Sequence, residues 1–298
     1  MIYSFPRYLA SKRTVDDRAL NRTVWAALQQ ALAPVVAPRI LEIGGGTGAM
    51  FQRMLEWGLL SSGEYTLVDA AQENVAAASL ALPEWGRRRG LTVDEQCGGL
   101  RFSTPSASMD LKLVANDLFD FIDHAAGQTY RYDLLVAHAF LDLVDIPRAL
   151  ALLRTVLHSG SLMYLTINFD GLTAFEPDYE HRLDEKVIAL YHQSMDDRPT
   201  GGDSRSGRRL FTWLPQAGFS ILEAGSSDWA VFPQQGAYQA DEAYFLHFIL
   251  HFFESSLSGH AALAGEPFAD WLAVRRAQIE TGQLVFLAHQ FDFLAAMT

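Results

Sequence analysis

Short apolar stretches alternate with amphipathic ones along most of the chain. The apolar stretches predict buried strands, whereas apolar residues that recur every three or four positions predict helices. The expected strands span residues 39–43, 65–69, 111–115, 134–138, 161–168, 219–229 and 284–291. Because helical segments separate the first five strands, the pattern predicts an α/β fold with a parallel sheet and right-handed crossovers.

The region before the first expected strand has a helical pattern of its own. Residues 14–32 carry apolar side chains at helical spacing, Thr14 is placed to cap the helix, and Pro34 ends it. Residues 1–38 are therefore expected to form an N-terminal arm and helix, and residues 39–298 the main domain.

Two segments exceed what a minimal sheet requires, at about residues 171–215 and 233–283. They contain helical patterns over residues 179–195, 243–253 and 267–280, and a Gly/Ser/Arg-rich loop at 198–209 that is expected to be mobile. A helix that is apolar on all sides must be covered. The insertions therefore either form a helical cap over the strand ends or make a homodimer contact through the apolar helix 241–257.

Composition narrows the classes of partner. The net charge of −12 argues against extended nucleic acid, because phosphate contacts need a basic surface, and it favours a small-molecule substrate. No stretch is long and apolar enough to span a membrane. A single cysteine, Cys97, excludes an internal disulfide and is expected to be a buried or loop thiol; with no signal peptide evident, a cytoplasmic location is expected.

A glycine-rich turn follows the first expected strand. Gly44-x-Gly46-x-x-Ala49 satisfies the dinucleotide pattern, and Gly44-x-Gly46-x-Gly48 after Glu42 satisfies the acidic-x-G-x-G-x-G pattern of S-adenosylmethionine (SAM) enzymes. A carboxylate beside the turn repels a diphosphate, but it favours a ligand that carries an ammonium and a sulfonium group. Together with Asp69 at the end of the second strand, the pattern favours SAM.

From this point the chain resembles the class I SAM-dependent methyltransferases, over about residues 39–170. The resemblance implies a Rossmann-like, mostly parallel sheet of seven strands in the order 3-2-1-4-5-7-6, with the last strand antiparallel and helices on both faces. It also implies that Asp69 and Ala70 lie at the ribose and that Asn116, Asp117 and Leu118 lie at the adenine. The residues that it assigns to the cofactor are Glu42, Gly44, Gly46, Gly48, Asp69, Ala70, Asn116, Asp117 and Leu118.

Candidate residues for the acceptor lie beyond the fourth strand. His138, at the carboxyl end of that strand, is placed to act as a general base or to hold a ligand, although a histidine that is hydrogen-bonded to the backbone at a strand end is the more common case. Asp142 is a candidate for orienting a polar acceptor, whereas Asp145 is expected to cap the next helix. Aromatic residues such as Tyr179 and Trp229 are candidates for the substrate pocket, and no metal site is expected.

The sequence therefore predicts an enzyme that moves a methyl group from SAM to an oxygen or nitrogen of a small molecule. Positioning is the main requirement of such an in-line displacement. Two other classes remain open at this stage. One is an NAD-dependent oxidoreductase that uses the same glycine turn, and the other is a non-catalytic module that binds SAM.

Overall fold

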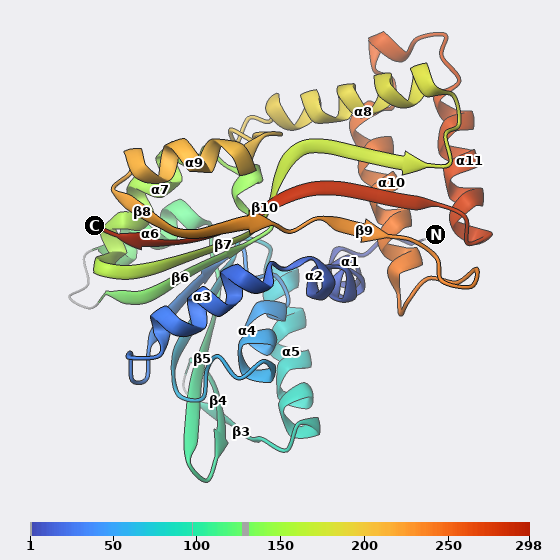
Figure 1. Ribbon diagram of the computed structural model, residues 1–298. Coiled ribbons are helices and arrows are strands. Elements are labelled where there is room, and N and C mark those ends of the chain that lie inside the picture. The colour runs from blue at the N-terminus through green and yellow to red at the C-terminus, as the bar shows by residue number, and fades with distance from the viewer. Residues whose placement is uncertain (1, 97, 127–130) are drawn as a thin grey trace.

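The computed structural model describes residues 2–96, 98–126 and 131–298, and a single mixed sheet runs through it (Figure 1). The sheet has ten strands among these residues: β1 (Arg39–Ile43), β2 (Gly63–Asp69), β3 (Thr92–Gln96), β4 (Gly99–Thr104), β5 (Ala107–Ala115), β6 (Tyr132–His138), β7 (Leu157–Glu176), β8 (Phe219–Ser226), β9 (Trp229–Val231) and β10 (Val285–Met297). Their order is β3-β4-β5-β2-β1-β6-β7-β10-β8, and β9 pairs with β10. Cys97, which was expected to be a buried or loop thiol, lies outside the described residues.

The prediction of seven strands is correct only in part. The seven expected ranges do occur, in the relative order β5-β2-β1-β6-β7-β10-β8, with β10 antiparallel to both of its neighbours. The complete order differs because β3 and β4 extend the β5 edge as an antiparallel pair and because the expected strand 219–229 is divided into β8 and β9. Four of the five β3 residues are exposed, so the apolar pattern of the sequence does not indicate a strand here.

Helices cover both faces of the sheet: α1 (Phe5–Ser11), α2 (Arg13–Ala19), α3 (Arg22–Leu32), α4 (Ala49–Glu56), α5 (Gln72–Arg88), α6 (Leu118–Ala126), α7 (Ile146–Leu153), α8 (His181–Asp196), α9 (Ser206–Gln216), α10 (Glu242–Leu257) and α11 (Phe268–Glu280). Single 3-10 turns lie at Leu141–Leu143, Arg154–Val156 and Ala261–Leu263. Residues of α3, α4 and α5 fill the core on one face, and residues of α6, α7 and α9 fill the core on the other (Figure 1).

The single helix expected over residues 14–32 is wrong, because the chain breaks between α2 and α3. Asn21 caps α3 with its side chain, which accepts from the amides of Thr23 and Val24. The amide of Asn21 itself donates to Asp292 of β10, 2.8 Å away. Thr14 does not cap a helix; its hydroxyl instead donates to Glu242. A carboxylate 271 residues away thus helps to set the break, which a local pattern cannot reveal.

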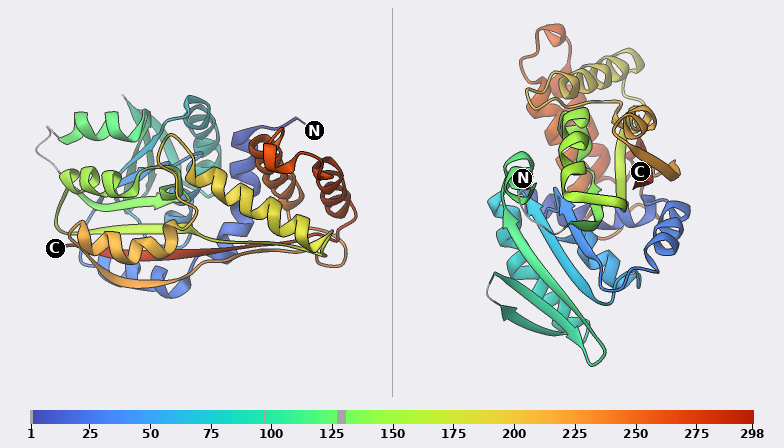
Figure 2. Two further views of the ribbon diagram at one scale, coloured as in Figure 1. Left: turned by 90° about the horizontal axis from the view of Figure 1, so that it is seen from above. Right: turned by 90° about the vertical axis from the view of Figure 1, so that its left-hand side faces the viewer.

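The second half of the chain builds a helical cap at one end of the sheet, opposite the β3–β4 hairpin (Figure 2). Here β7 and β10 extend beyond their neighbours, and α8, α10 and α11 pack against them and one another. These helices match the three helical patterns expected at residues 179–195, 243–253 and 267–280. The loop expected at 198–209 is shorter than predicted, because its last four residues form the first turn of α9.

The apolar helix α10 is covered within the chain. It packs against α1, α8 and α11, and most of its aromatic and aliphatic side chains are buried. The homodimer expected through residues 241–257 is therefore without support. None of the helices in the described ranges is long and apolar enough to cross a bilayer.

Candidate functional site

The glycine turn after β1 forms the floor of a first cavity at the carboxyl ends of the strands, which we call the turn cavity. Gly44 and Gly46 adopt φ values of 63° and 55°, a region that favours glycine. A Cβ on Gly46 would lie 2.8 Å from Leu9 of α1, so the arm packs directly over the turn. The turn cavity is lined by Phe5, Leu9, Lys12, Glu42, Gly44, Gly45, Gly46, Thr47, Ala49, Met50, Asp69, Ala70, Ala71, Asn74, His138, Ala139, Phe140 and Leu143.

Asp69 ties the turn to the second strand. Its carboxylate accepts from the amide of Gly46 at 2.8 Å and from the amide of Ala71 at 2.9 Å. The side-chain amide of Asn74 donates to the same carboxylate at 3.1 Å, while the side-chain oxygen of Asn74 is buried without a hydrogen-bond partner in the described structure. Asp69 therefore fixes the conformation of the turn, and the side-chain oxygen of Asn74 is an unused acceptor beside it.

Glu42 lies at the base of the turn cavity and is almost completely buried. It accepts a hydrogen bond from the hydroxyl of Tyr65 at 2.8 Å. Burial raises the pKa of Glu42 to about 8, although the Tyr65 bond and the charge of Arg53 oppose the rise. The charge argument from the sequence thus needs refinement: at neutral pH the free protein holds Glu42 largely in its neutral form, and a cationic ligand would favour its ionisation.

The structure brings together most of the predicted cofactor residues. Glu42, Gly44, Gly46, Asp69 and Ala70 all line the turn cavity. The other four predicted residues lie outside its lining: Gly48, which precedes α4, and Asn116, Asp117 and Leu118, which follow β5. These four assignments stay predictions.

Two of those outlying residues have visible structural roles. The amide of Asn116 donates to the carbonyl of Asp69 at 3.0 Å, which places it next to the cavity residues. The side chain of Asp117 accepts from the amide of Phe119 at 2.8 Å, so it caps the start of α6. The position predicted for adenine therefore borders the turn cavity but contributes nothing to its wall in this conformation.

A second cavity, which we call the aromatic cavity, adjoins the first beneath the helical cap. It is lined by Phe5, Tyr8, Leu9, Lys12, Ala139, Asp142, Leu143, Ile167, Phe169, Thr173, Tyr191, Met195, Arg198, Trp229, Ile249, Phe252, Phe253, Phe286, Ala288 and Gln290. The two cavities share the side chains of five residues, namely Phe5, Leu9, Lys12, Ala139 and Leu143. The arm, the core sheet and both insertions thus contribute to one site.

Two of the three predicted substrate residues lie at this cavity. Asp142 and Trp229 line it, and their contact with a substrate stays a prediction. Tyr179 does not line it; it precedes α8, where its backbone amide donates to Asp184. Burial raises the pKa of the Asp142 carboxyl, against the opposing charge of Arg198. Sequence reasoning missed Lys12 and Arg198 as cavity residues, because neither belongs to a motif.

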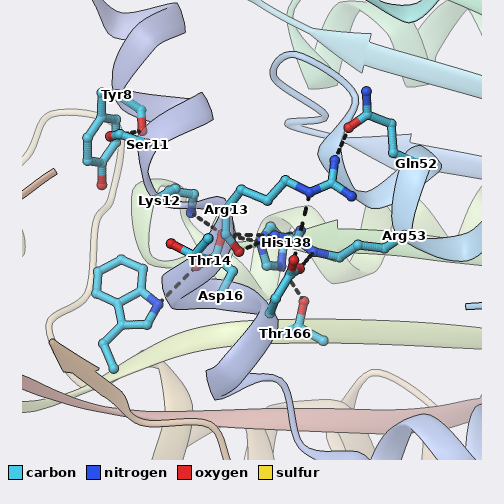
Figure 3. Close-up of polar contacts among 12 residues, drawn as sticks. Tyr8, Ser11, Lys12, Arg13, Thr14, Asp16, Gln52, Arg53, His138 and Thr166 are labelled. Atoms are coloured by element: carbon cyan, nitrogen blue, oxygen red, sulfur yellow. Dashed lines mark hydrogen bonds and ion pairs between the residues drawn. The ribbon is translucent and has the colours of Figure 1, made fainter. Parts of the chain in front are cut away.

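His138 is surrounded by protein partners on both sides of its ring (Figure 3). Its Nε2 lies 2.9 Å from Asp16, and its Nδ1 lies 2.8 Å from the hydroxyl of Thr166. Because an ionised carboxylate can only accept, Nε2 carries the proton and Nδ1 accepts from Thr166. Neither nitrogen is then free to take a proton from an acceptor, so the role of His138 as a general base gains no support from the geometry and stays a prediction.

His138 belongs to a buried charge cluster that we define as Lys12, Asp16, Arg53 and His138. Arg53 is completely buried, and its guanidinium lies 3.5 Å from Asp16 and 3.4 Å from His138. Burial lowers the pKa of His138 to about 4, despite the nearby carboxylate of Asp16. Burial alone would raise the pKa of Asp16, but Lys12, His138 and Arg53 together hold it below its usual value. The cluster therefore contains an ionised Asp16 and a neutral His138 at pH 7.

Two residues with unusual backbone conformations stand where the cavities meet the sheet. Ala139 and Ile167 have φ values of 51° and 57°, a region that non-glycine residues rarely adopt and that costs about 1–3 kcal/mol each. The amide of Ala139 donates to Thr166, and that of Ile167 donates to Asp292, both at 2.8 Å. Both residues line the aromatic cavity. Two of the five described non-glycine residues with positive φ therefore lie at this cavity.

The other polar residues considered from the sequence have structural partners. Asp145 caps α7, as expected, by accepting from the amide of Arg148. Arg208 pairs with Asp170 and Arg209 with Asp203, so neither arginine lines a cavity. Within residues 2–96, 98–126 and 131–298, no group of three or more His, Cys, Asp or Glu side chains is placed to hold a metal ion.

Solved structures share this architecture, although no family model and no curated protein sequence matches the chain. A proposed type II methyltransferase from Anaeromyxobacter dehalogenans aligns with a TM-score of 0.51 and 16% identity, over 93% of this chain and 96% of that one. A SAM-dependent methyltransferase from Thiobacillus denitrificans, solved with S-adenosylhomocysteine, aligns with a TM-score of 0.47 and 14% identity over 100% of both chains. A cyclopropane synthase from Mycobacterium tuberculosis aligns with a TM-score of 0.46 and 10% identity over 99% of both chains. The first of these alignments shows that the chain has a Rossmann-like α/β fold of the kind found in methyltransferases.

Proposed function

We propose that this protein is an enzyme that transfers a methyl group from SAM to a small molecule. The observation that carries the proposal is the junction of two chemically different cavities. One presents a glycine turn with two carboxyl groups, and the other is lined mainly by aromatic and aliphatic side chains. In-line transfer requires a donor and an acceptor held in contact and aligned, and two adjoining cavities meet this requirement.

The residues of the turn cavity fit SAM. Its methionine end carries a cationic ammonium near a cationic sulfonium, which suits the buried Glu42 at the base of the turn. Ribose hydroxyls need acceptors, and the carboxylate of Asp69 together with the unpartnered side-chain oxygen of Asn74 supplies them. When bound, SAM would supply an activated methyl group. The chain's residues would hold it, exclude water and orient the acceptor.

The two rival functions are less well supported. A dinucleotide would place a diphosphate against the turn, where the carboxylate of Asp69 already accepts from the amide of Gly46 and the arm residue Leu9 lies directly over Gly46. A non-catalytic SAM-binding module needs no second cavity. The aromatic cavity beside Ala139 therefore favours the enzyme over the binding module.

Calorimetric titration with SAM, S-adenosylhomocysteine and NADH tests the cofactor assignment. We expect SAM and S-adenosylhomocysteine to give a heat of binding that changes when Glu42 is substituted. We expect no heat of binding from NADH. Tight NADH binding without SAM binding would overturn the proposal. A metabolite library screened for release of S-adenosylhomocysteine then tests catalysis. SAM binding with no release from any acceptor would leave the binding module as the better description.

A further inference from the structure

Lys12 is the charged residue on the wall that the two cavities share. The other shared residues are apolar: Phe5, Leu9, Ala139 and Leu143. Lys12 follows α1, and 6% of its surface is exposed. Its ammonium lies 3.3 Å from Asp16 and 5.3 Å from the ring centre of Trp229. A group at the junction of the two cavities would therefore lie beside Lys12.

The ammonium has hydrogen-bonding capacity that Asp16 does not use. A lysine carries three N–H donors, and a single carboxylate oxygen at 3.3 Å can satisfy only part of them. Asp16 is also shared, because it accepts from Trp229 at 2.9 Å and pairs with His138 and Arg53. Lys12 is therefore held in place by a carboxylate whose charge is already divided among several partners.

We infer that the acceptor is an apolar molecule that presents an anionic oxygen, a carboxylate or a phenolate, to Lys12 at the junction of the two cavities. This inference rests on the proposed function and specifies its substrate class. The ammonium would hold the oxygen at the mouth of the turn cavity. The aromatic walls would enclose the remainder of the molecule.

An anionic oxygen also resolves the question of the base. Neither nitrogen of His138 is free to remove a proton, so a site that binds an oxygen already ionised needs no base. The proton of the acceptor leaves to solvent before binding. In the transfer itself, the bond from oxygen to the methyl carbon forms as the bond from sulfur to that carbon breaks, and its electron pair stays on sulfur.

The same ammonium disfavours an amine. A protonated amine would be repelled by Lys12, and methylation of a neutral amine would create a positive charge beside the same ammonium. The other cation of the aromatic cavity, Arg198, lines that cavity alone, whereas Lys12 also lines the turn cavity. Lys12 is thus better placed to hold an anion at the junction of the two cavities.

Two fluorescent probes of the same aromatic framework test this inference. 8-Anilinonaphthalene-1-sulfonate is anionic, and N-phenyl-1-naphthylamine lacks the sulfonate. We expect Lys12→Met to weaken binding of the anionic probe by about tenfold and that of the neutral probe by less than about twofold. Lys112→Met, which removes an exposed lysine on β5, should change neither. Equal effects on both probes, or none, would overturn the inference.

Displacement of the sulfonate probe distinguishes the two sources of the anion. Displacement by 2-naphthoate at neutral pH would indicate a carboxylate acceptor, whereas displacement by 2-naphthol only where it is ionised would indicate a phenolate. If only 2-naphthylamine displaces the probe, the inference fails. A larger loss of anionic probe in Arg198→Met than in Lys12→Met would place the anion at the wrong end of the cavity and would also overturn it.

Two further measurements separate this inference from the proposed function. SAM affinity, measured by calorimetry on each variant, reports on the turn cavity independently of the probes. If SAM binds and the probes do not discriminate, the substrate class is wrong but the proposed function stands. Thermal unfolding of each variant, with Lys12→Gln as a second substitution, ensures that any loss of probe binding reflects a folded protein.

Discussion

The two cavities of the site are built in opposite ways. The turn cavity is formed largely by one continuous stretch, from Glu42 to Asn74, and its contacts come from backbone amides, carboxyl groups and a rigid turn. The aromatic cavity is formed by residues as far apart as Phe5 and Gln290, and most of its wall is aromatic or aliphatic. The turn cavity suits a ligand with fixed polar groups, and the aromatic cavity suits a ligand that is recognised mainly by its apolar shape.

This difference implies that the two cavities tolerate change unequally. A rigid turn held by a few charged groups fails when one of them is lost, because the partners left behind are buried and unsatisfied. An aromatic wall can exchange one apolar side chain for another at smaller cost. In the buried charge cluster of Lys12, Asp16, Arg53 and His138, Lys12 lines both cavities and His138 lines the turn cavity, whereas Asp16 and Arg53 line neither.

The largest expected effect comes from that cluster, because loss of one buried charge there should destabilise the whole protein. Arg53→Met would leave the buried carboxylate of Asp16 with fewer counter-charges, and we expect a loss of about 3–5 kcal/mol in the free energy of unfolding. Denaturant titration measures this loss. The control Arg7→Met removes an ion pair with Asp241 in which both side chains are about half exposed, and its effect on the free energy of unfolding should be far smaller. Similar losses in the two variants would show that the cluster contributes no more than a surface pair.

A smaller effect should separate the cavities. Asp69→Ala removes the acceptor for Gly46 and Ala71, and we expect SAM to bind at least about tenfold more weakly, or about 1.4 kcal/mol. Calorimetry measures this change, and N-phenyl-1-naphthylamine should bind as in the wild type. Asp145→Ala is the matched control, since that carboxylate caps α7 outside the lining of either cavity. Unchanged SAM affinity in Asp69→Ala would refute the assignment of Asp69 to the ribose.

The smallest effect, counted per pH unit, is a dependence of stability on pH that belongs to the turn cavity. The pKa of Glu42 is raised from 4.5 to about 8, so between these values the folded protein holds a proton that the unfolded chain has released. Its contribution to stability is complete below the unfolded pKa and is lost as pH rises through the folded pKa. We expect the free energy of unfolding of the wild type, relative to Glu42→Gln, to fall by about 1 kcal/mol per pH unit in this window.

Denaturant titrations of both proteins at several pH values measure that difference. Saturating SAM should flatten it, because a cation beside Glu42 favours the ionised carboxylate. Parallel curves for the wild type and Glu42→Gln would show that Glu42 does not change its ionisation between the folded and unfolded states.

The sequence predicts the turn cavity much better than the aromatic one, for a physical reason. The glycines from Gly44 to Gly48 and the acid Asp69 are required by local backbone geometry, so their spacing along the chain reflects their spacing in space. Lys12 and Arg198 reach their cavity through tertiary packing alone. No spacing relates them, and a lone lysine after a short helix is normally solvated.

Two features of the fold show the same limit. The break between α2 and α3 is stabilised by Asp292, which no window around Asn21 contains. The strand β3 is mostly exposed and exists because β4 pairs with it. By contrast, the seven buried strands and the three cap helices have apolar periodicities of their own, and those elements were predicted from the sequence.

The position of α1 has a kinetic consequence. One helix of seven residues lines both cavities, through Phe5 and Leu9, and packs over the glycine turn. Ligands in the two cavities would therefore both lie against this one helix. If the proposed function holds, movement of α1 on binding of either ligand would change access to both cavities, and the methyl donor and its acceptor would then load in a compulsory order.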